Sequence, residues 1–356
     1  MSNFTAMDNK LKIGFTLGDV NGIGPEVLIK ALDDNRILKL CTPVIYGSNR
    51  ILSFYKKMFN IEGFNYTTCI DADQTNTKSV NLINCITDDI ILQPGQDTAI
   101  AGKTALISLE AATHDLLANK IDALVTAPIN KNNMQQSGFN YHGHTEYFNA
   151  KAGDKESVML LMNENLRVGL VTNHLAIKEI PTAITKEKIL QKIELINHSL
   201  KQDFAIFNPT IAVLGLNPHS GDGGLLGDEE KNIIIPAIKA AQDKKIYVVG
   251  PFAADGFFGS GNYQKFDVIL AMYHDQGLVG FKSLSFGSGI NFTAGLPFVR
   301  TSPDHGTAYD IAGKNEASGE SMLHAIFGAI DICNRRVSYT ESIKNPLKRS
   351  YVEAER

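Results

Sequence analysis

Short apolar runs recur along the chain, separated by polar or glycine-rich segments. Runs of this length are typical of strands buried in a parallel sheet, whereas apolar residues at helical spacing predict helices. We predict strands at residues 12–17, 42–47, 123–127, 211–216, 247–251, 268–273, 290–293 and 296–302. We predict helices at residues 25–32, from about 48, and at 98–120, 186–201 and 321–335. Alternating strands and helices predict an α/β fold.

Two features refine this prediction. The apolar segments 157–161 and 167–172 flank Asn163-Glu164-Asn165, which predicts a hairpin and therefore a mixed sheet. The glycine-rich segment 18–24 lies between the first strand and the first helix, which is the position of an anion site or of a tight turn. Its glycines fit neither a dinucleotide-binding fingerprint nor a P-loop, so both interpretations stay open.

The bulk composition narrows the class of protein. The 356 residues suffice for two domains or one large α/β unit, and the net charge of -4 gives no electrostatic case for binding nucleic acid or an anionic membrane. The four cysteines are scattered without a C-x-x-C pair, which indicates buried thiols in a reducing compartment. No apolar signal segment and no membrane-spanning run are visible, so we expect a cytoplasmic protein.

Three predicted strands end on a histidine, at His174, His219 and His274. Each alone could be a structural or surface residue. Because the ends of strands in one parallel sheet point at one crevice, the three imidazoles could meet there or across a subunit interface. Such a set with an open position is a divalent metal site of the catalytic type.

Other polar residues stand at similar places. Asp275 and Lys282 follow the strand 268–273, and Arg300 lies near the end of a later strand, where it could bind a phosphate or carboxylate. His144 and Thr145 precede a helix, which they could cap or where they could bind a phosphate. Lys131 is interpreted as a solvated loop lysine, although a site role is open.

The longer motifs resemble those of a known family. They are GDVNGIGPE, TAPINK, HGHTEYF, VTNHLAIKEIP, LNPHSGDGGLLGDEE, GPFAADGFF, AMYHDQGLVGFK, NFTAGLPFVRTSPDHGTAYDIAG and SMLHA. Together, and in this order from about Lys12 to Ile330, they resemble the 4-hydroxythreonine-4-phosphate dehydrogenases, NAD-dependent enzymes of vitamin B6 biosynthesis.

The resemblance implies an isopropylmalate-dehydrogenase-like fold, with two α/β/α domains and the active site in the cleft between them. Residues 1–135 plus 300–356 would form the cofactor-side domain, and residues 136–299 the metal and dimerisation domain. It also implies a homodimer in which His174, His219 and His274 bind one divalent ion (Zn²⁺, Mg²⁺ or Co²⁺), one histidine coming from the partner subunit.

The resemblance also assigns residues to the ligands. Substrate binding falls to His144, Thr145, Lys282, Asn291 and Arg300. The cofactor, NAD or NADP, would lie along the segment 305–313, at His305, Gly306, Thr307, Asp310 and Gly313. The proton acceptor would be Lys282, Asp275 or a bound water.

The implied reaction is metal-dependent oxidation of 4-phosphohydroxy-L-threonine to 2-amino-3-oxo-4-(phosphooxy)butanoate, which decarboxylates to 3-amino-2-oxopropyl phosphate. The chain departs from the family pattern at Val20-Asn21, Gly256 and Gly280, which leaves room for a relative that oxidises threonate or erythronate 4-phosphate. An acyl-phosphate transferase needs no metal, so the three histidines argue against it. A phospho-acid binding protein without catalysis is a third alternative.

Overall fold

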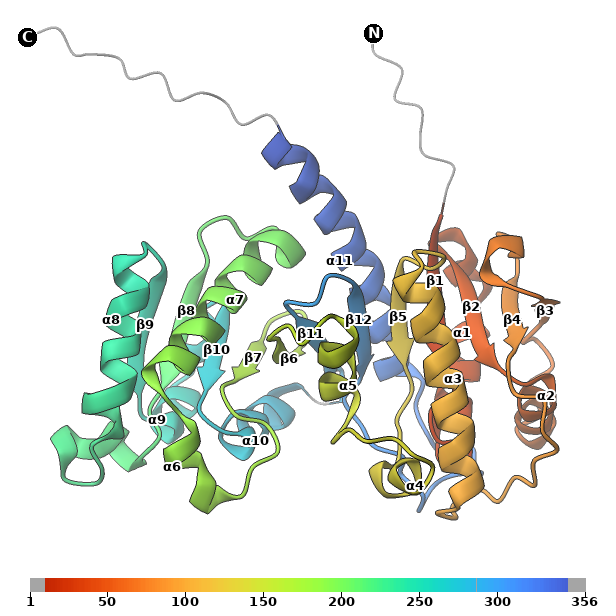
Figure 1. Cartoon of the computed structure of the whole chain (residues 1–356), viewed down its shortest axis with the longest axis horizontal. Helices are drawn as coiled ribbons and strands as arrows, with labels where there is room; N and C mark the ends of the chain where they lie inside the picture. Colours follow the sequence, from red (N-terminus) through yellow and green to blue (C-terminus); the bar gives the residue numbers. More distant parts are fainter. Residues whose placement is uncertain (1–9, 286, 345–356) are drawn as a thin grey trace, which may run out of the picture.

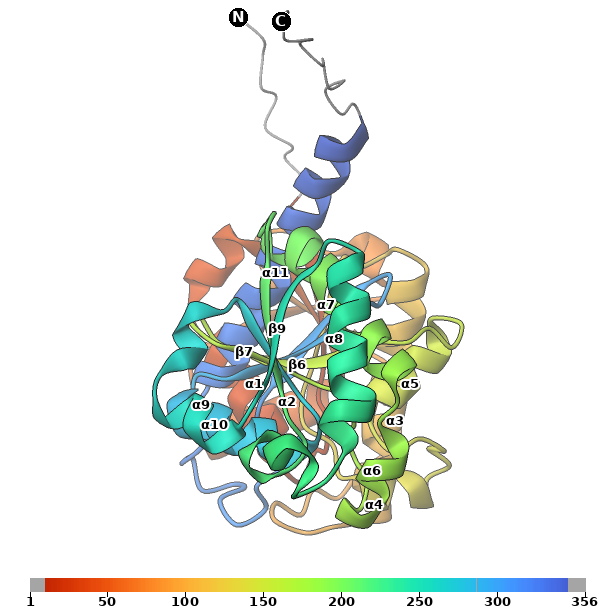
Figure 2. The same cartoon turned by 90° about the vertical axis from the view of Figure 1, so that its left-hand side faces the viewer.

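The computed structural model describes residues 10–285 and 287–344, and it consists of a 12-stranded sheet with helices packed on both faces (Figures 1 and 2). The strands are β1 (Leu11–Thr16), β2 (Cys41–Gly47), β3 (Tyr66–Cys69), β4 (Val80–Asn84), β5 (Ala123–Thr126), β6 (Val158–Met162), β7 (Arg167–Leu170), β8 (Thr210–Leu214), β9 (Tyr247–Phe252), β10 (Val268–Ala271), β11 (Ile290–Ala294) and β12 (Val299–Pro303). The helices are α1 (Gly24–Leu32), α2 (Asn49–Met58), α3 (Ala99–Leu117), α4 (Lys131–Gln136), α5 (His144–Lys151), α6 (Ile180–Ala183), α7 (Lys186–Phe204), α8 (Ile235–Asp243), α9 (Ala254–Gly259), α10 (His274–Ser285) and α11 (Glu320–Lys344). The predicted α/β class is confirmed.

The strands follow the order β3-β4-β2-β1-β5-β12-β11-β6-β7-β10-β8-β9. The first six pair in parallel, as do the last four, while β11 and β6 join the two groups through antiparallel pairings. The predicted hairpin is present, with Leu161 of β6 opposite Val168 of β7. The sheet is therefore mixed, as its sequence pattern predicted.

Burial explains why the strands read as continuous apolar runs. All four residues of β10 are buried, and so are all seven of β2, because helices cover both faces of the sheet. On β1, Ile13 and Phe15 are fully buried on one face, and Gly14 leaves room on the other face for Ile121 and Tyr46. Because both faces of these strands are packed against other residues, the strands have one register, and the positions of their ends are fixed.

The last part of the chain returns to the first strands. β12 pairs with β5, and α11 packs against β12 and α7 and reaches α1. One sheet runs through both halves, so the division into residues 1–135 plus 300–356 and residues 136–299 stays a prediction. The loops and helices after β5, β7 and β10 lie along the lower side of Figure 1, where α4, α6 and α10 are labelled.

Apart from the short helices α4, α6 and α9, which were not predicted, two longer helices differ from the sequence-based prediction. The helix α10 was not predicted: the segment after β10 was interpreted only as a polar strand end, yet it folds into a 12-residue helix that begins at His274. The last helix is longer than the predicted 321–335, because α11 continues to Lys344 with a mostly polar final part. The apolar residues at helical spacing stop before the helix ends, because its final part buries little apolar surface.

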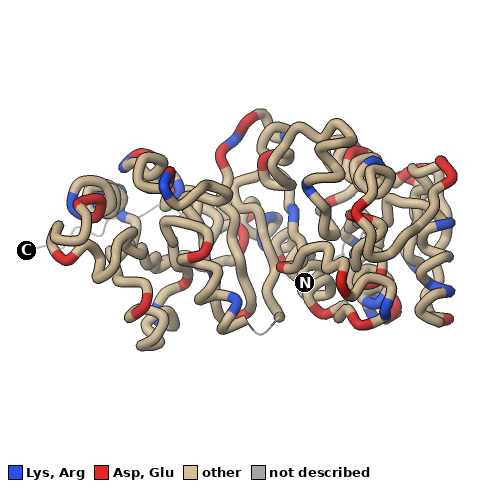
Figure 3. Tube along the Cα trace, turned by 90° about the horizontal axis from the view of Figure 1, so that it is seen from below, with Lys and Arg blue, Asp and Glu red and all other residues tan. Residues whose placement is uncertain are grey.

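The charged residues are interspersed. Along the trace in Figure 3, Lys and Arg alternate with Asp and Glu over both halves of the molecule. Among the described helices, none has the length and apolar character that crossing a membrane requires.

Candidate active site

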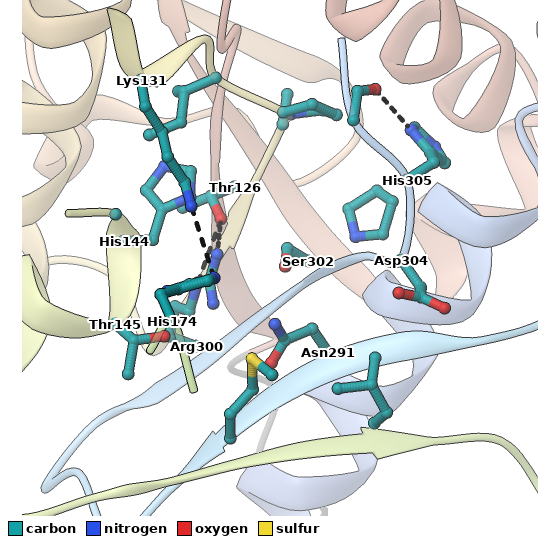
Figure 4. A pocket seen from close by; sticks show the side chains of 18 of the residues that line it. Thr126, Lys131, His144, Thr145, His174, Asn291, Arg300, Ser302, Asp304 and His305 are labelled. Carbon is teal, nitrogen blue, oxygen red and sulfur yellow. Dashed lines mark hydrogen bonds between the residues drawn. The ribbon is translucent and has the colours of Figure 1, made fainter. Parts of the chain in front are cut away.

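A cavity of about 390 Å³ lies where the loops after β5, β7, β10 and β12 meet. It gathers nine of the predicted site residues: His144, Thr145, His174, His274, Lys282, Asn291, Arg300, His305 and Gly306. Figure 4 shows Lys131, His144, His174 and Arg300 on one side of this cavity and Asp304 and His305 on the other. The cavity therefore has a cationic and imidazole-rich end that faces the segment after β12.

Arg300 is a buried cation without a carboxylate hydrogen bond. It is 2% exposed, and its Nη2 and Nε donate to the Thr126 hydroxyl at 2.6 and 3.1 Å, while Nη1 donates to Thr293 Oγ1 at 3.3 Å. Its guanidinium also lies 5.7 Å from the ring centre of Phe148. Burial lowers the pKa of Arg300 to about 9, and nearby Glu146 opposes that shift. A buried guanidinium held by neutral groups is suited to bind an anionic ligand.

His144 and Thr145 begin helix α5, but neither caps it. Gly143 is the N-cap residue, and no side chain accepts a hydrogen bond there, so the capping interpretation is wrong. Burial lowers the pKa of His144 well below its usual range, as do Arg300 and Lys131 nearby, so its imidazole is neutral. Its Nε2 atom is buried without a hydrogen-bond partner. This orphaned atom at a helix N-terminus leaves a polar position for a ligand.

Two of the three predicted metal ligands lie side by side. The rings of His174 and His274 are 5.9 Å apart between centres, at an interplanar angle of 38°. The Nε2 atom of His174 is 3.4 Å from Lys131 Nζ, and its Nδ1 is 3.9 Å from Glu146 Oε1. That contact with His174 lowers the pKa of the Glu146 carboxyl. Two adjacent imidazoles fit part of the donor set of a divalent ion such as Zn²⁺.

The third predicted ligand lies elsewhere. His219 stands on the loop after β8 and lines a neighbouring cavity of about 590 Å³, together with Asp255 and Asp275. Within the described residues, no group of three or more His, Cys, Asp or Glu side chains could hold a metal ion. One chain therefore brings together two of the three histidines, and the predicted sharing of the site between subunits stays a prediction.

The two candidate proton acceptors differ in position. Lys282 lines the main cavity, with Nζ 3.6 Å from Asp304 Oδ1, whereas Asp275 does not line it. The Oδ1 atom of the exposed Asp275 lies within hydrogen-bond distance of His274 Nδ1, at 2.7 Å. Asp275 also lines a smaller cavity of about 210 Å³, together with His174 and His274. Asn291 lines the main cavity, and its Oδ1 is buried without a partner.

The predicted cofactor residues separate into two sets. His305 and Gly306 line the cavity, and the Nε2 atom of His305 is buried without a hydrogen-bond partner. Thr307, Asp310 and Gly313 do not line it. Thr307 instead packs on the first loop, where its carbonyl oxygen accepts from the Ile23 N–H at 2.9 Å. The orphaned His305 nitrogen, on the other side of the cavity from His174 in Figure 4, fits a ligand along this segment.

The glycine-rich segment 18–24 lies outside the cavity lining. Gly18 has φ +62°, and a Cβ atom there would stand 2.2 Å from the Pro128 carbonyl oxygen, so only glycine fits. Asp19 N–H then donates to Pro128 O at 2.8 Å. These contacts fit the tight-turn interpretation, because the segment packs against the loop after β5 rather than facing the cavity.

Sequence reasoning missed several lining residues, among them Lys131, Glu146, Ser302 and Asp304. Lys131 follows β5 and Asp304 follows β12, so the strand-end signal that identified His274 applied to both. Lys131 was interpreted as a solvated loop lysine with a site role left open; it is exposed and it also lines the cavity. Glu146 stands one residue after Thr145, and its sequence position allowed either a first-turn acid of the helix or a member of a phosphate-binding cluster with His144 and Thr145.

Comparisons with known proteins agree with the resemblance. The family model described as pyridoxal phosphate biosynthetic protein PdxA matches residues 39–329. A 4-hydroxythreonine-4-phosphate dehydrogenase of Bacteroides thetaiotaomicron is 48% identical, over 97% of this chain and 95% of that protein. A protein of the same description from Aquifex aeolicus is 43% identical, over 88% and 96%.

Solved structures give the same picture. A 4-hydroxythreonine-4-phosphate dehydrogenase from Klebsiella pneumoniae has a TM-score of 0.79 at 33% identity, covering 92% of this chain and 99% of that one. A terephthalate 1,2-cis-dihydrodiol dehydrogenase from Burkholderia xenovorans has a TM-score of 0.60 at 24% identity, covering 91% and 98%. The latter similarity concerns the fold alone.

Proposed function

The chain belongs to the family of pyridoxal phosphate biosynthetic protein PdxA, and on that premise we propose that it oxidises 4-phosphohydroxy-L-threonine with NAD⁺ or NADP⁺. Hydride leaves C3 of the substrate for the nicotinamide ring, and the hydroxyl proton leaves to a base. The product, 2-amino-3-oxo-4-(phosphooxy)butanoate, is a β-keto acid, and it loses CO₂ to give 3-amino-2-oxopropyl phosphate. The observation that carries the proposal is the buried, carboxylate-free Arg300 in one cavity with the histidine pair.

The cationic end of the cavity anchors the substrate. Arg300 offers a buried guanidinium, and His144 and Thr145 offer polar groups at the start of α5. The neutral His144 donates or accepts through its unpartnered Nε2, and Asn291 presents a free amide oxygen. A substrate with a phosphate and a carboxylate meets complementary charge here. Lys282 on α10 also lines this cavity and can donate a hydrogen bond to the substrate.

His174 and His274, whose rings are adjacent, would hold the divalent ion (Zn²⁺, Mg²⁺ or Co²⁺), and His219 from the second subunit of a homodimer would complete the set. Such an ion, when bound, lowers the pKa of a hydroxyl group that it contacts and stabilises negative charge on the adjacent oxygen. The short contact between His274 Nδ1 and Asp275 orients that imidazole, which leaves its Nε2 free to face the ion.

Lys282 is the better placed of the two proton acceptors. It lines the cavity, whereas Asp275 contacts the far side of His274. Asp304 stands 3.6 Å from Lys282 Nζ and holds this side chain near the segment that carries His305. The cofactor, when bound, would lie along residues 305–313, where His305 and Gly306, which line the cavity, would hold its nicotinamide end. Binding of the cofactor along this segment needs no G-x-G-x-x-G turn.

The test is NAD(P)⁺ reduction by chelator-treated protein, with and without added Zn²⁺, Mg²⁺ or Co²⁺. The offered substrates are 4-phosphohydroxy-L-threonine, threonate 4-phosphate and erythronate 4-phosphate, each alone. Metal-dependent turnover of the amino acid alone supports the proposal. Preference for a sugar acid keeps the chemistry and changes the substrate. No reduction of either cofactor by folded, metal-supplied protein would refute a dehydrogenase.

A further inference from the structure

A buried hydrogen-bond cluster lies behind the cofactor-side wall of the cavity. The Tyr309 hydroxyl donates to Asp19 Oδ2 at 2.7 Å and accepts from Asn130 Nδ2 at 2.9 Å. Asn133 Nδ2 donates to the same Asp19 oxygen at 2.6 Å. Asp19 and Tyr309 are 290 positions apart in the sequence, so the fold alone brings them together.

The charge at the centre of this cluster has no cation beside it. Asp19 is fully buried, and no described lysine or arginine lies within ion-pair distance of it. Its oxygens accept from the Tyr309 hydroxyl, the Asn133 amide and the Asn21 N–H. A carboxylate kept in the interior by neutral donors is a costly way to join three segments, because apolar side chains would do so without desolvating a charge. The cluster therefore calls for a role beyond packing.

The position of the cluster supplies that role. Asp19 follows β1, Asn130 follows β5 and Tyr309 follows β12. Asn130 stands between two residues that line the cavity, and Tyr309 lies three residues after Gly306, which also lines it. Pro128, Ile129 and Lys131 form one wall, and His305 and Gly306 form another. Asp19 also holds the first wall directly, since its N–H donates to Pro128 O at 2.8 Å. Tyr309 itself does not line the cavity, so it acts on the cavity wall through these neighbours.

We propose that Tyr309, through its hydrogen bonds to Asp19 and Asn130, is a positioning residue for the nicotinamide cofactor. It fixes the segment 305–309 against the loop 128–131, and so sets the width of the cavity at the place where the cofactor enters. The inference rests on the proposed function. It assigns Tyr309 and Asp19 no contact with substrate and no part in proton transfer.

The test compares two variants that each remove one tyrosine hydroxyl hydrogen-bonded to a buried aspartate. Tyr309→Phe breaks the proposed connection. Tyr46→Phe is the matched control, because Tyr46 OH donates to Asp115 Oδ2 at 2.9 Å in the same half of the molecule but outside the cavity lining. Dissociation constants for NADH and NADPH are measured by the fluorescence of the reduced nicotinamide, which the absence of tryptophan leaves free of energy transfer from indole.

We expect Tyr309→Phe to raise the dissociation constant of the bound cofactor about tenfold, equivalent to 1.4 kcal/mol. In turnover assays the KM for NAD(P)⁺ should rise similarly, while the KM for the phosphorylated substrate stays within about twofold. Tyr46→Phe should leave both KM values and the dissociation constants unchanged. Asp19→Asn keeps an acceptor for the hydroxyl, so it should weaken cofactor binding less than Tyr309→Phe does.

Three results would overturn the inference alone. They are unchanged NADH and NADPH binding in a folded Tyr309→Phe protein, an equal loss of binding in Tyr46→Phe, and a rise confined to the KM of the phosphorylated substrate. Should Tyr309→Phe fail to fold, Asp19→Asn carries the same comparison, with unchanged cofactor binding as the contrary result. If the wild-type chain binds neither reduced cofactor and reduces neither oxidised one, the proposed function falls and this inference falls with it.

Discussion

The substitution Arg300→Met separates the stability of the fold from the binding of the substrate. Methionine has a similar length and no charge, so it removes the cation while it keeps much of the side-chain volume. Burial lowers the pKa of Arg300 from its usual value to about 9. At 1.36 kcal/mol per pKa unit, this difference corresponds to roughly 5 kcal/mol by which the fold disfavours the charged side chain.

The variant also loses hydrogen bonds to Thr126 and Thr293. A hydrogen bond of this kind contributes about 1 kcal/mol net, so these losses and the incomplete packing of methionine cancel part of the gain. We expect Arg300→Met to be more stable than the wild-type chain by about 2 kcal/mol. Substrate binding should weaken by about 2 to 5 kcal/mol, which is roughly 30-fold to several thousandfold, because the anion loses its buried partner.

Urea unfolding at neutral pH measures the first quantity, in a buffer without phosphate because a bound anion would stabilise only the wild type. Added inorganic phosphate should then raise the melting temperature of the wild type and leave the variant unaffected. A base whose folded pKa lies below its unfolded pKa makes the fold more stable as pH rises through the folded value. The advantage of the variant should therefore shrink by about 1.4 kcal/mol per pH unit above pH 9. A variant that unfolds at lower urea than the wild type, and binds substrate normally, would refute the reasoning.

Three further predictions follow from single contacts. His219→Ala should abolish metal-dependent turnover and leave the urea midpoint unchanged; normal kcat and metal content would contradict the shared metal site. Gly18→Ala should destabilise the fold by about 3 kcal/mol or more in urea unfolding, because φ is +62° and the new Cβ would lie 2.2 Å from Pro128 O. Gly153→Ala is the control, because Gly153 has φ +81° but open space around it, so this variant measures the cost of the backbone conformation without the clash. His144 has a lowered folded pKa, so the unfolded chain takes up the proton first and stability falls as pH drops below about 6.5. His144→Gln should flatten this loss in urea midpoints measured between pH 7 and pH 5, and an unchanged slope would contradict it.

The sequence predicted those parts of the site that follow local rules. A polar residue at the end of a predicted buried strand is a candidate site residue. This rule identified His174, His274 and Arg300, and all three line the cavity. The same rule applied to Lys131, which was set aside because a loop lysine is usually solvated. The α/β class and the β6–β7 hairpin were predictable for a similar reason, since both depend on short stretches of apolar periodicity.

The remaining features depend on contacts between distant segments. Helix α10 escaped prediction because His274, Asp275 and Gln276 read as the end of a strand, while the apolar face that buries Leu278 and Phe281 against β7 follows only from the sheet order. The pairing of Asp19 with Tyr309 was equally hidden, because an aspartate in a glycine-rich turn looks solvated until the segment after β12 covers it.

Arg300 and Asp19 together show how the fold uses buried charge. Each is an interior charged group whose hydrogen bonds come from neutral partners, and each therefore lowers the stability that the same volume of apolar side chain would give. They lie on opposite sides of the loop 126–131: Arg300 reaches its first residue through Thr126, and Asp19 holds Pro128 and, through Tyr309, Asn130. Substitutions that stabilise the chain at either place should therefore weaken a ligand, the phosphorylated substrate for Arg300 and the nicotinamide cofactor for Asp19. Two separable losses of affinity, each with a gain or no loss in unfolding free energy, are what this arrangement predicts.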